Sequence, residues 1–155
     1  MTERVDFYVL KTATARQRWA FTCRLTEKAY LKDLKIVIVS DTLADAQALD
    51  ELLWTFNERS FIPHKLCLDA QSVDPATSVH LTVDTPIPSA DLLVKADLMV
   101  NLAHRLPSDF QRYARIAEVI DADEEHRRLG RERFKAYRDL KLNLETHQID
   151  ETADV

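Results

Sequence analysis

The sequence predicts an α/β fold, organised as a single three-layer domain around a largely parallel sheet with nucleotide-binding-like topology. Two observations support this prediction. Short runs of apolar residues, many of them β-branched, alternate along the chain with longer segments whose apolar residues recur at helical spacing. The run KIVIV at residues 35–39 is continuously apolar after its lysine, which is typical of a strand covered on both faces.

The first half of the chain supplies two strand–helix units. Residues 4–10 read as a strand whose second half is mostly buried. A helix is predicted over residues 14–31, where apolar side chains fit a helical period and neither Gly nor Pro intervenes. After the strand at residues 35–39, Asp41 offers an N-cap for a second helix, TLADAQALDELLW, whose leucines and alanines follow the same period.

The second half is predicted to contain three short strands and two helices. The strands lie at residues 61–68, 78–83 and 97–102, and Pro-containing loops join them. Ser108 is predicted to cap a helix that runs through residue 120. A final helix is predicted over residues 123–143, and the polar residues after it are expected to fray.

The chain is predicted to form one domain over residues 1–147, followed by a polar tail at residues 148–155 that is expected to be disordered. No apolar run reaches the roughly 18 to 20 residues that a bilayer span needs. The opening MTERVDFYVL lacks the layout of a signal peptide. Cys23 and Cys67 are expected to be buried thiols, and the protein is predicted to be cytoplasmic.

Glycine and histidine usage argues against cofactor and metal sites. A phosphate cradle needs glycine, because the backbone must turn sharply and approach the pyrophosphate closely. The only glycine in the sequence, Gly130, falls inside the last predicted helix, which excludes a dinucleotide fingerprint and a phosphate loop. The five histidines show no zinc-binding spacing. We therefore predict no cofactor and no metal.

The candidate catalytic residues are few. Cys67 lies three residues after His64, but strand alternation would place the two side chains on opposite faces. Asp6, Asp41 and Asp97 lie near strand ends, where aspartate is also the commonest cap and turn residue. A small hydrolase or transferase would need a polar cleft at the strand ends, which these residues do not predict. The sequence favours a binding protein over an enzyme.

The stretch RRLGRERFKAYR holds six Lys/Arg and one Glu, in a chain whose formal net charge is -5. On a helix, four of these cations form one stripe beside Phe134. The stripe comprises Arg127, Arg131, Lys135 and Arg138. The apolar positions expected to pack against the sheet are Leu129, Ala136, Leu140 and Leu144. A solvated face usually mixes charge signs, so this stripe predicts a site for an acidic peptide with an apolar anchor.

The stretch LLWTFNERSFIPHKL crowds large apolar residues around the end of a helix and the loop after it. These residues are Trp54, Phe56, Phe61, Ile62 and Pro63. Connecting segments run over the surface, and exposed aromatic patches mark protein partners. The stretch therefore predicts a docking surface.

The segments LDELLW, SFIPH and RERFKAYR, together with the opening DFYVL, resemble the chi subunit family of the bacterial DNA polymerase III holoenzyme. The resemblance runs from residue 6 to about residue 144, in matching order and separation. It implies a non-catalytic accessory subunit of the clamp-loader complex that acts in DNA replication, at nucleoid-associated replication forks. It also implies an α/β fold akin to nucleotide-binding folds.

The resemblance implies two protein partners and no membrane. In that family the last helix binds the acidic C-terminal tail of single-stranded DNA-binding protein, and another surface binds the psi subunit. The positions that match the tail site are Arg127, Arg131, Phe134 and Lys135, and neighbouring Arg128 is expected to join them. The positions that match the psi-facing surface are Trp54, Phe61 and Pro63, with Leu66. A helicase is a further possible partner of the psi-facing surface, and DNA is met indirectly.

The tail is expected to insert its final phenylalanine against Phe134, with its α-carboxylate on Arg131 or Lys135 and its upstream aspartates along Arg127 and Arg128. The family pattern has lysine at position 127 and tyrosine at position 134, so the charge and the ring are kept and a phenolic hydroxyl is lost. The alternative is direct binding of single-stranded nucleic acid through the basic helix. That alternative lacks the interleaved stacking aromatics such sites use.

Overall fold

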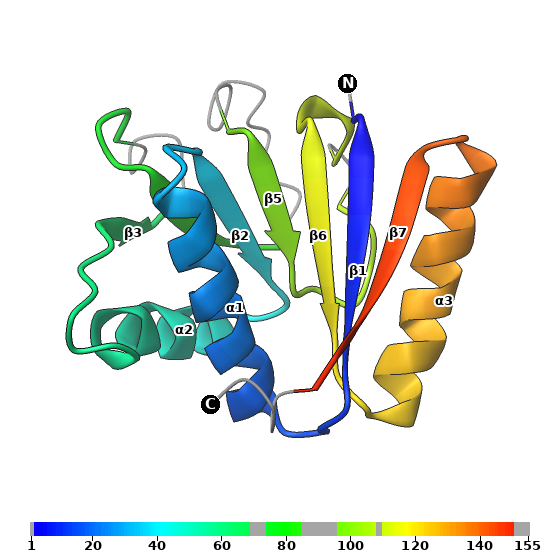
Figure 1. Cartoon of the computed structure of the whole chain (residues 1–155), viewed down its shortest axis with the longest axis horizontal. Coiled ribbons are helices and arrows are strands. Elements are labelled where there is room, and N and C mark those ends of the chain that lie inside the picture. The colour runs from blue at the N-terminus through cyan, green and yellow to red at the C-terminus, as the bar shows by residue number, and fades with distance from the viewer. Residues whose placement is uncertain (1, 69–73, 85–95, 108–109, 151–155) are drawn as a thin grey trace.

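The computed structural model describes residues 2–68, 74–84, 96–107 and 110–150. The strands are β1 (Arg4–Leu10), β2 (Ile36–Ser40), β3 (His64–Leu66), β4 (Val79–Val83), β5 (Leu98–Asn101), β6 (Arg115–Ile120) and β7 (Asn143–Ile149). The helices are α1 (Ala15–Tyr30), α2 (Leu43–Thr55) and α3 (Glu124–Asp139), with a 3-10 turn, η2 (Phe110–Arg112). The strands form one sheet in the order β3-β4-β2-β5-β6-β1-β7, and every described pairing is parallel (Figure 1). This confirms the predicted α/β class.

Helices cover both faces of the sheet. Strand β2 shows why, because Ile36 and Ile38 belong to the core beneath α1 and α2, whereas Val37 and Val39 belong to the core beneath α3. All four side chains are buried. The continuous apolar run at residues 35–39 is therefore a strand with a core on each side, as predicted.

The first half of the chain follows the predicted elements closely, with one shift at a helix start. The N-cap of α2 is Thr42, whose hydroxyl accepts a hydrogen bond from the backbone N–H of Asp45 at 3.1 Å. Asp41, the predicted cap, instead accepts a hydrogen bond from the backbone N–H of His104 at 3.3 Å. Both residue types can cap a helix, so composition alone could not choose between adjacent positions.

The helix predicted to run through residue 120 is wrong. Only the short turn η2 is helical there, and Arg115–Ile120 forms β6 between β5 and β1. Every residue of β6 except Arg115 is buried, because cores lie on both of its faces. Such a strand shows no alternation, and a short apolar run does not distinguish strand from helix. Ser108 lies outside the described residues.

The prediction that the chain frays after its last helix is also wrong. Helix α3 ends at Asp139, and Lys141, with a φ of 61°, turns the chain into β7. Strand β7 pairs with the whole of β1, and its polar composition reflects a position at the edge of the sheet. The tail predicted at residues 148–155 thus begins inside β7, and residues 151–155 lie outside the described residues.

The strand order places the two candidate surfaces far apart. The crossover from β6 through α3 to β7 passes over β1, so α3 lies at one end of the sheet (Figure 1). The end of α2 and strand β3 lie at the opposite end (Figure 1). No helix within the described residues is long and apolar enough to cross a membrane.

Candidate functional site

The buried face of α3 differs from the predicted apolar seam. Its buried residues are Gly130, Arg133 and Tyr137, whereas Leu140, a predicted seam residue, is 47% exposed. Phe134 is partly buried and packs against the core beneath α3. A charged and a phenolic side chain can occupy this face because β6 contributes a buried acid beneath them.

That acid is Glu118, which is fully buried and anchors a polar network. Arg133, 5% exposed, donates from Nε to Glu118 Oε1 at 3.0 Å and from a terminal nitrogen to the His104 carbonyl at 2.7 Å. Glu118 Oε2 accepts hydrogen bonds from the Tyr137 hydroxyl at 2.7 Å and from Asn101 Nδ2 at 2.9 Å. Burial, then the charge and hydrogen bond of Glu118, raises the pKa of Tyr137, so its hydroxyl stays a donor. The network fixes α3 on the sheet.

Two of the predicted site arginines already have partners within the chain. Arg128 forms ion pairs with Glu125 at 2.5 Å and with Glu132 at 3.1 Å on the exposed side of α3. Arg127 donates to two backbone carbonyls, those of Asp121 at 3.2 Å and Leu10 at 3.0 Å. The charge of Arg128 is therefore neutralised by two neighbouring glutamates. The guanidinium of Arg127 is hydrogen-bonded to carbonyl oxygens, which carry no net charge.

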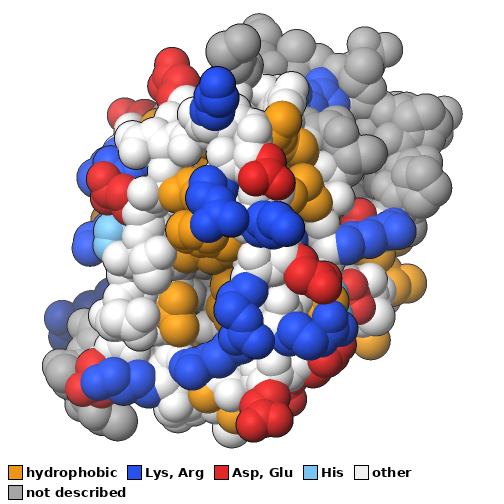
Figure 2. Space-filling view, turned by 90° about the vertical axis from the view of Figure 1, so that its right-hand side faces the viewer, with side chains coloured by type: hydrophobic (Ala, Val, Ile, Leu, Met, Phe, Trp, Pro, Cys, Tyr) orange, Lys and Arg blue, Asp and Glu red, His pale blue; other side chains and the backbone are white. Residues whose placement is uncertain are grey.

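The remaining cations of α3 are open to solvent. Arg131, Lys135 and Arg138 are exposed, and none of their side chains has a hydrogen bond or ion pair to another residue of the described chain. Figure 2 views the molecule from the side of α3 and shows Lys and Arg side chains gathered around a strip of hydrophobic side chains. The local excess of positive charge that the sequence predicted is thus present at the surface.

A cavity of about 250 Å³ lies between the first half of α3 and the sheet. Phe7, Val9 and Ile120 line it from the sheet, and Phe134 lines it from the helix. Arg127 and Arg131 lie at its helix side, and Thr146 and Gln148 of β7 complete its lining. An apolar floor with cationic groups beside it suits an apolar side chain that carries or adjoins a carboxylate.

The ring of Phe134 is one wall of this cavity. It meets the ring of Phe7 edge to face, with centroids 5.1 Å apart, and it is half-buried rather than sealed in the core. Gly130, one turn earlier, also lines the cavity. A Cβ at this position would lie only 2.5 Å from Ile120 Cδ1, so a larger residue would crowd the sheet. The single glycine thus permits a close approach of α3 to β6.

The aromatic patch at the other end of the sheet is exposed in part. Trp54 is 46% exposed and Phe61 is 70% exposed, and their ring centroids lie 5.4 Å apart. Trp54 also packs on His64, whose ring is held by the carbonyls of Ile62 and Asp50 at 2.7 and 2.9 Å. Two large aromatic side chains are therefore held against a fixed support and face solvent.

The other residues predicted for this surface contribute less exposed area. Pro63 and Leu66 are half-buried, and Leu66 and Phe56 pack against the core beneath α1 and α2. Ile62 is buried. The exposed part of the patch thus centres on Trp54 and Phe61.

The weak catalytic candidates have structural roles. Both ring nitrogens of His64 lie on carbonyl oxygens, and Cys67 is buried, so they form no nucleophile–base pair. Cys23 is also buried, as predicted, and burial raises the pKa of its thiol to about 12. Asp97 accepts a hydrogen bond from the Lys35 backbone at 2.8 Å.

Asp6 belongs to an ion-pair cluster on β1, β6 and β7. Its carboxylate accepts hydrogen bonds from Arg4 at 3.0 Å, Arg115 at 3.3 Å and His147 at 2.9 Å. Potential metal-ligand atoms of Asp6, Glu145 and His147 lie within 4.8 Å of one another. Arg4 also pairs with Glu145 at 2.6 Å, so guanidinium groups already supply the positive charge that both carboxylates need.

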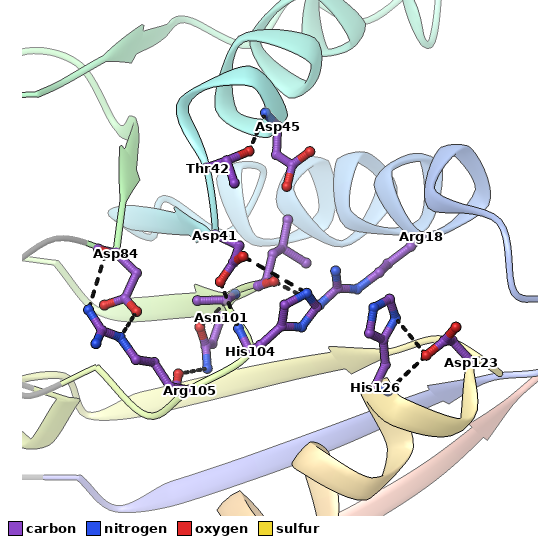
Figure 3. Close-up of polar contacts among 12 residues, drawn as sticks. Arg18, Asp41, Thr42, Asp45, Asp84, Asn101, His104, Arg105, Asp123 and His126 are labelled. Carbon is purple, nitrogen blue, oxygen red and sulfur yellow. Dashed lines mark hydrogen bonds and ion pairs between the residues drawn. The ribbon is translucent and has the colours of Figure 1, made fainter.

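A polar cluster at the carboxyl ends of β5 and β6 was not predicted (Figure 3). The rings of His104 and His126 stack with centroids 4.5 Å apart. His126 Nδ1 lies 2.7 Å from Asp121 Oδ1. Burial lowers the pKa of His104, which favours the neutral ring. The two histidines are 22 positions apart in the sequence, and only their elements' places in the sheet bring them together.

Arg18 of α1 fills the space beside this cluster (Figure 3). It donates to the carbonyl of Val119 at 2.8 Å and to that of Leu102 at 2.9 Å. In open α/β sheets, ligands usually bind at the carboxyl ends of the strands. Here the buried guanidinium of Arg18 links the carboxyl ends of β5 and β6, where a ligand would bind in such folds. This agrees with the lack of a glycine-rich loop for a phosphate group.

A sequence profile of the DNA polymerase III chi subunit family matches residues 1–145. The chain belongs to this family. It is 30% identical to the chi subunit of Pseudomonas aeruginosa over 146 residues, which cover 94% of this chain and 96% of that protein. It is 26% identical to the chi subunit of Haemophilus influenzae over 153 residues, covering 96% and 99% of the two chains.

Membership in the chi family confirms the resemblance found in the sequence. The Escherichia coli chi subunit is 23% identical over 124 residues, which cover 80% of each chain. The protein is thus a chi subunit of DNA polymerase III, an accessory subunit in DNA replication.

A solved structure, that of T4 UvsW, shares the chi fold. It superposes with a TM-score of 0.70 at 9% sequence identity. The match covers 96% of this chain and 42% of the UvsW chain, so this chain spans less than half of that protein. The likeness concerns the fold alone.

Proposed function

We propose that this chi subunit bridges the psi subunit of DNA polymerase III and the acidic C-terminal tail of single-stranded DNA-binding protein. The observation that carries the tail half of the proposal is the cavity beneath α3, with an apolar floor and unpaired cations beside it. The observation that supports the psi half is the exposed aromatic pair at the opposite end of the sheet.

The cavity accounts for the apolar part of tail binding. Cavities of about 150 Å³ in other proteins hold benzene, and this one measures about 250 Å³. Burying a phenyl side chain contributes about 1.5–3 kcal/mol. Phe134 and Phe7 offer ring edges and faces to such a side chain. The terminal ring of the tail therefore supplies the larger part of the affinity.

The cations contribute the smaller part, and they do not contribute equally. Arg131 is exposed, unpaired and at the cavity, so it is best placed for the α-carboxylate, and Lys135 follows one turn later. Arg128 would have to exchange its pairs with Glu125 and Glu132. An exposed ion pair contributes about 0–1 kcal/mol, and Arg128 would lose existing pairs in order to form a new one. Arg131 should therefore contribute more to the affinity for the tail than Arg128.

The psi subunit is proposed to cover Trp54 and Phe61, with Pro63 and Leu66 at the margin of the contact. Tryptophan is enriched among residues that dominate binding energy, and Trp54 packs on His64 on one side and on Phe61 on the other. A helicase with a complementary apolar surface would compete with psi for the same residues. The cavity and the aromatic pair lie at opposite ends of the sheet, which supports the proposal that both partners bind at once.

A tail contact of about micromolar strength suits this role. Many tails on coated DNA raise the local concentration, so weak single contacts give lasting attachment that can still be exchanged. The chain then meets DNA through the coating protein.

The tail half is tested by calorimetry with a synthetic peptide of aspartates that ends in phenylalanine. Arg131→Ala should weaken the peptide several-fold, whereas Arg128→Ala is the matched control and should change affinity less than twofold. Co-purification with psi should stay unchanged in both variants. Equal affinities for the parent and Arg131→Ala would refute the site.

The psi half is tested by Phe61→Ala and Trp54→Ala. Each should reduce co-purification with psi and leave peptide affinity intact, and full psi yield from both variants would refute the patch.

Calorimetry with a single-stranded oligonucleotide tests the alternative function, direct binding of single-stranded nucleic acid. Binding of the oligonucleotide at least as tight as the peptide, lost with Arg131→Ala, would favour direct nucleic-acid binding through α3.

A further inference from the structure

Strand β7 presents an open edge beside the cavity. It ends the sheet order, and within the described part of the chain its only strand partner is β1. Its seven residues pair with β1 in continuous register and include no proline or glycine. Native sheets usually shorten, bulge or interrupt such edges, because unpaired main-chain groups attract another strand.

The cavity brings a bound peptide to this edge. Thr146 and Gln148 of β7 line the cavity together with Arg127 and Arg131 of α3. A side chain seated there has its own backbone between α3 and β7. Extended peptides that add a strand to a sheet gain affinity from main-chain hydrogen bonds and specificity from such side-chain pockets.

The charges along α3 define the direction of that backbone. The first turn and its cap carry Asp123, Glu124 and Glu125, and the arginines that follow them, Arg127 and Arg128, already have partners within the chain. In the second half Lys135 and Arg138 have unpaired side chains and outnumber the exposed acid Asp139. An acidic segment is therefore drawn toward the second half, and not along Arg127 and Arg128 as the sequence predicts. Helix α3 runs antiparallel to β7, so its second half lies beside the start of β7 (Figure 1). The segment upstream of the anchored ring therefore extends toward the start of β7.

We propose that an acidic peptide with a C-terminal aromatic residue binds as an eighth strand, parallel to β7, with its ring in the cavity. The proposal rests on the tail site proposed above and adds the conformation and direction of the bound chain. The acid on the edge strand does not oppose it, because Glu145 is paired with Arg4 at 2.6 Å.

The test uses the full chain and the aspartate peptide ending in phenylalanine, N-methylated at one backbone position at a time. Along a strand, successive N–H groups point to opposite sides. Methylation at alternate peptide positions should therefore weaken binding about three- to tenfold, the effect of one lost hydrogen bond. Methylation at the intervening positions should change affinity less than twofold.

Direction is measured with a nitroxide at the peptide N-terminus and amide resonances of the isotope-labelled protein. Broadening should concentrate near Lys135 and Asn143. Broadening near Asp123 and Ile149 would overturn the parallel direction.

Uniform effects of methylation would overturn strand addition. If Arg131→Ala still weakened the unmethylated peptide in that case, the tail site would stand without the eighth strand. A peptide that binds equally to the parent and to Arg131→Ala would overturn both proposals.

Discussion

Arg133 donates from Nε to Glu118 Oε1 over 3.0 Å, and both side chains are almost completely removed from solvent. This ion pair joins α3 to β6 from inside the domain, and Tyr137 and Asn101 satisfy the second carboxylate oxygen. Buried pairs of this kind add little net stability relative to apolar residues, but losing one partner leaves an uncompensated charge. The pair therefore fixes where α3 lies, and the basic surface depends on it.

Replacing the acid of this pair should destabilise the domain strongly. Glu118→Ala leaves Arg133 buried without a counter-charge, and the free energy of unfolding should fall by about 3–5 kcal/mol. Glu132→Ala is the matched control, because it removes an exposed acid paired with Arg128 and should cost about 1 kcal/mol or less. Urea titrations measure both, and equal losses would contradict the assigned role of the buried pair.

Gly130→Ala should narrow the cavity with little effect on folding. The new Cβ would lie 2.5 Å from Ile120 Cδ1, the end of a flexible side chain that must shift, and both residues line the cavity. Alanine favours a helix by about 1 kcal/mol over glycine, which offsets the crowding. Calorimetry with the acidic peptide should show affinity reduced several-fold, while the thermal midpoint changes by only a few degrees. Unaltered peptide affinity would place the bound ring elsewhere.

Salt should separate the two binding surfaces. The proposed tail surface combines an apolar cavity with unpaired cations, whereas the proposed psi surface centres on Trp54 and Phe61. The screening length shrinks to about 10 Å at 0.1 M salt and to about 3 Å at 1 M. Peptide affinity should fall several-fold between these concentrations, and psi affinity should stay constant or rise. A salt-independent peptide affinity would mean that the cations of α3 take no part.

The Asp6 cluster should make stability depend on acid pH. Burial alone would raise the pKa of Asp6, but hydrogen bonds from His147, Arg4 and Arg115 outweigh it, so the pKa is lowered. A carboxyl with a lowered pKa stabilises the fold above its unfolded-state value of about 3.9, and this contribution disappears as pH falls through the folded-state value. Asp6→Asn should therefore lower the free energy of unfolding at pH 7 and much less near pH 3. An equal loss at both pH values would show that the charge is irrelevant.

The sequence allowed much of the fold to be predicted where one physical signal dominates. The two-sided burial of β2 follows from an unbroken β-branched run, and the period of α2 follows from its leucines and alanines. The same reasoning failed for β6, because RIAEVI is too short for its period to be read. It failed for β7 because an edge strand faces water and needs few apolar residues.

The site was predictable in its outline and not in its pairings. The spacing of Arg131 and Lys135 predicts a shared exposed face, and the structure places both there. Arg133 has the same side-chain chemistry as Arg131, but it is buried because it pairs with Glu118. Glu118 lies on β6, which the sequence did not predict as a strand, so the burial of Arg133 could not be predicted. The stacked His104 and His126 carry no signal of spacing at all, since tertiary structure alone joins them.

The width of the sheet has a consequence for cooperation between partners. Seven strands at about 4.8 Å spacing set the outer strands β3 and β7 roughly 29 Å apart. The proposed tail and psi surfaces share no residue, and five strands of the sheet separate β3 from β7. Occupation of one end should therefore leave the dissociation constant at the other unaltered, so the subunit would behave as a passive adaptor rather than a relay.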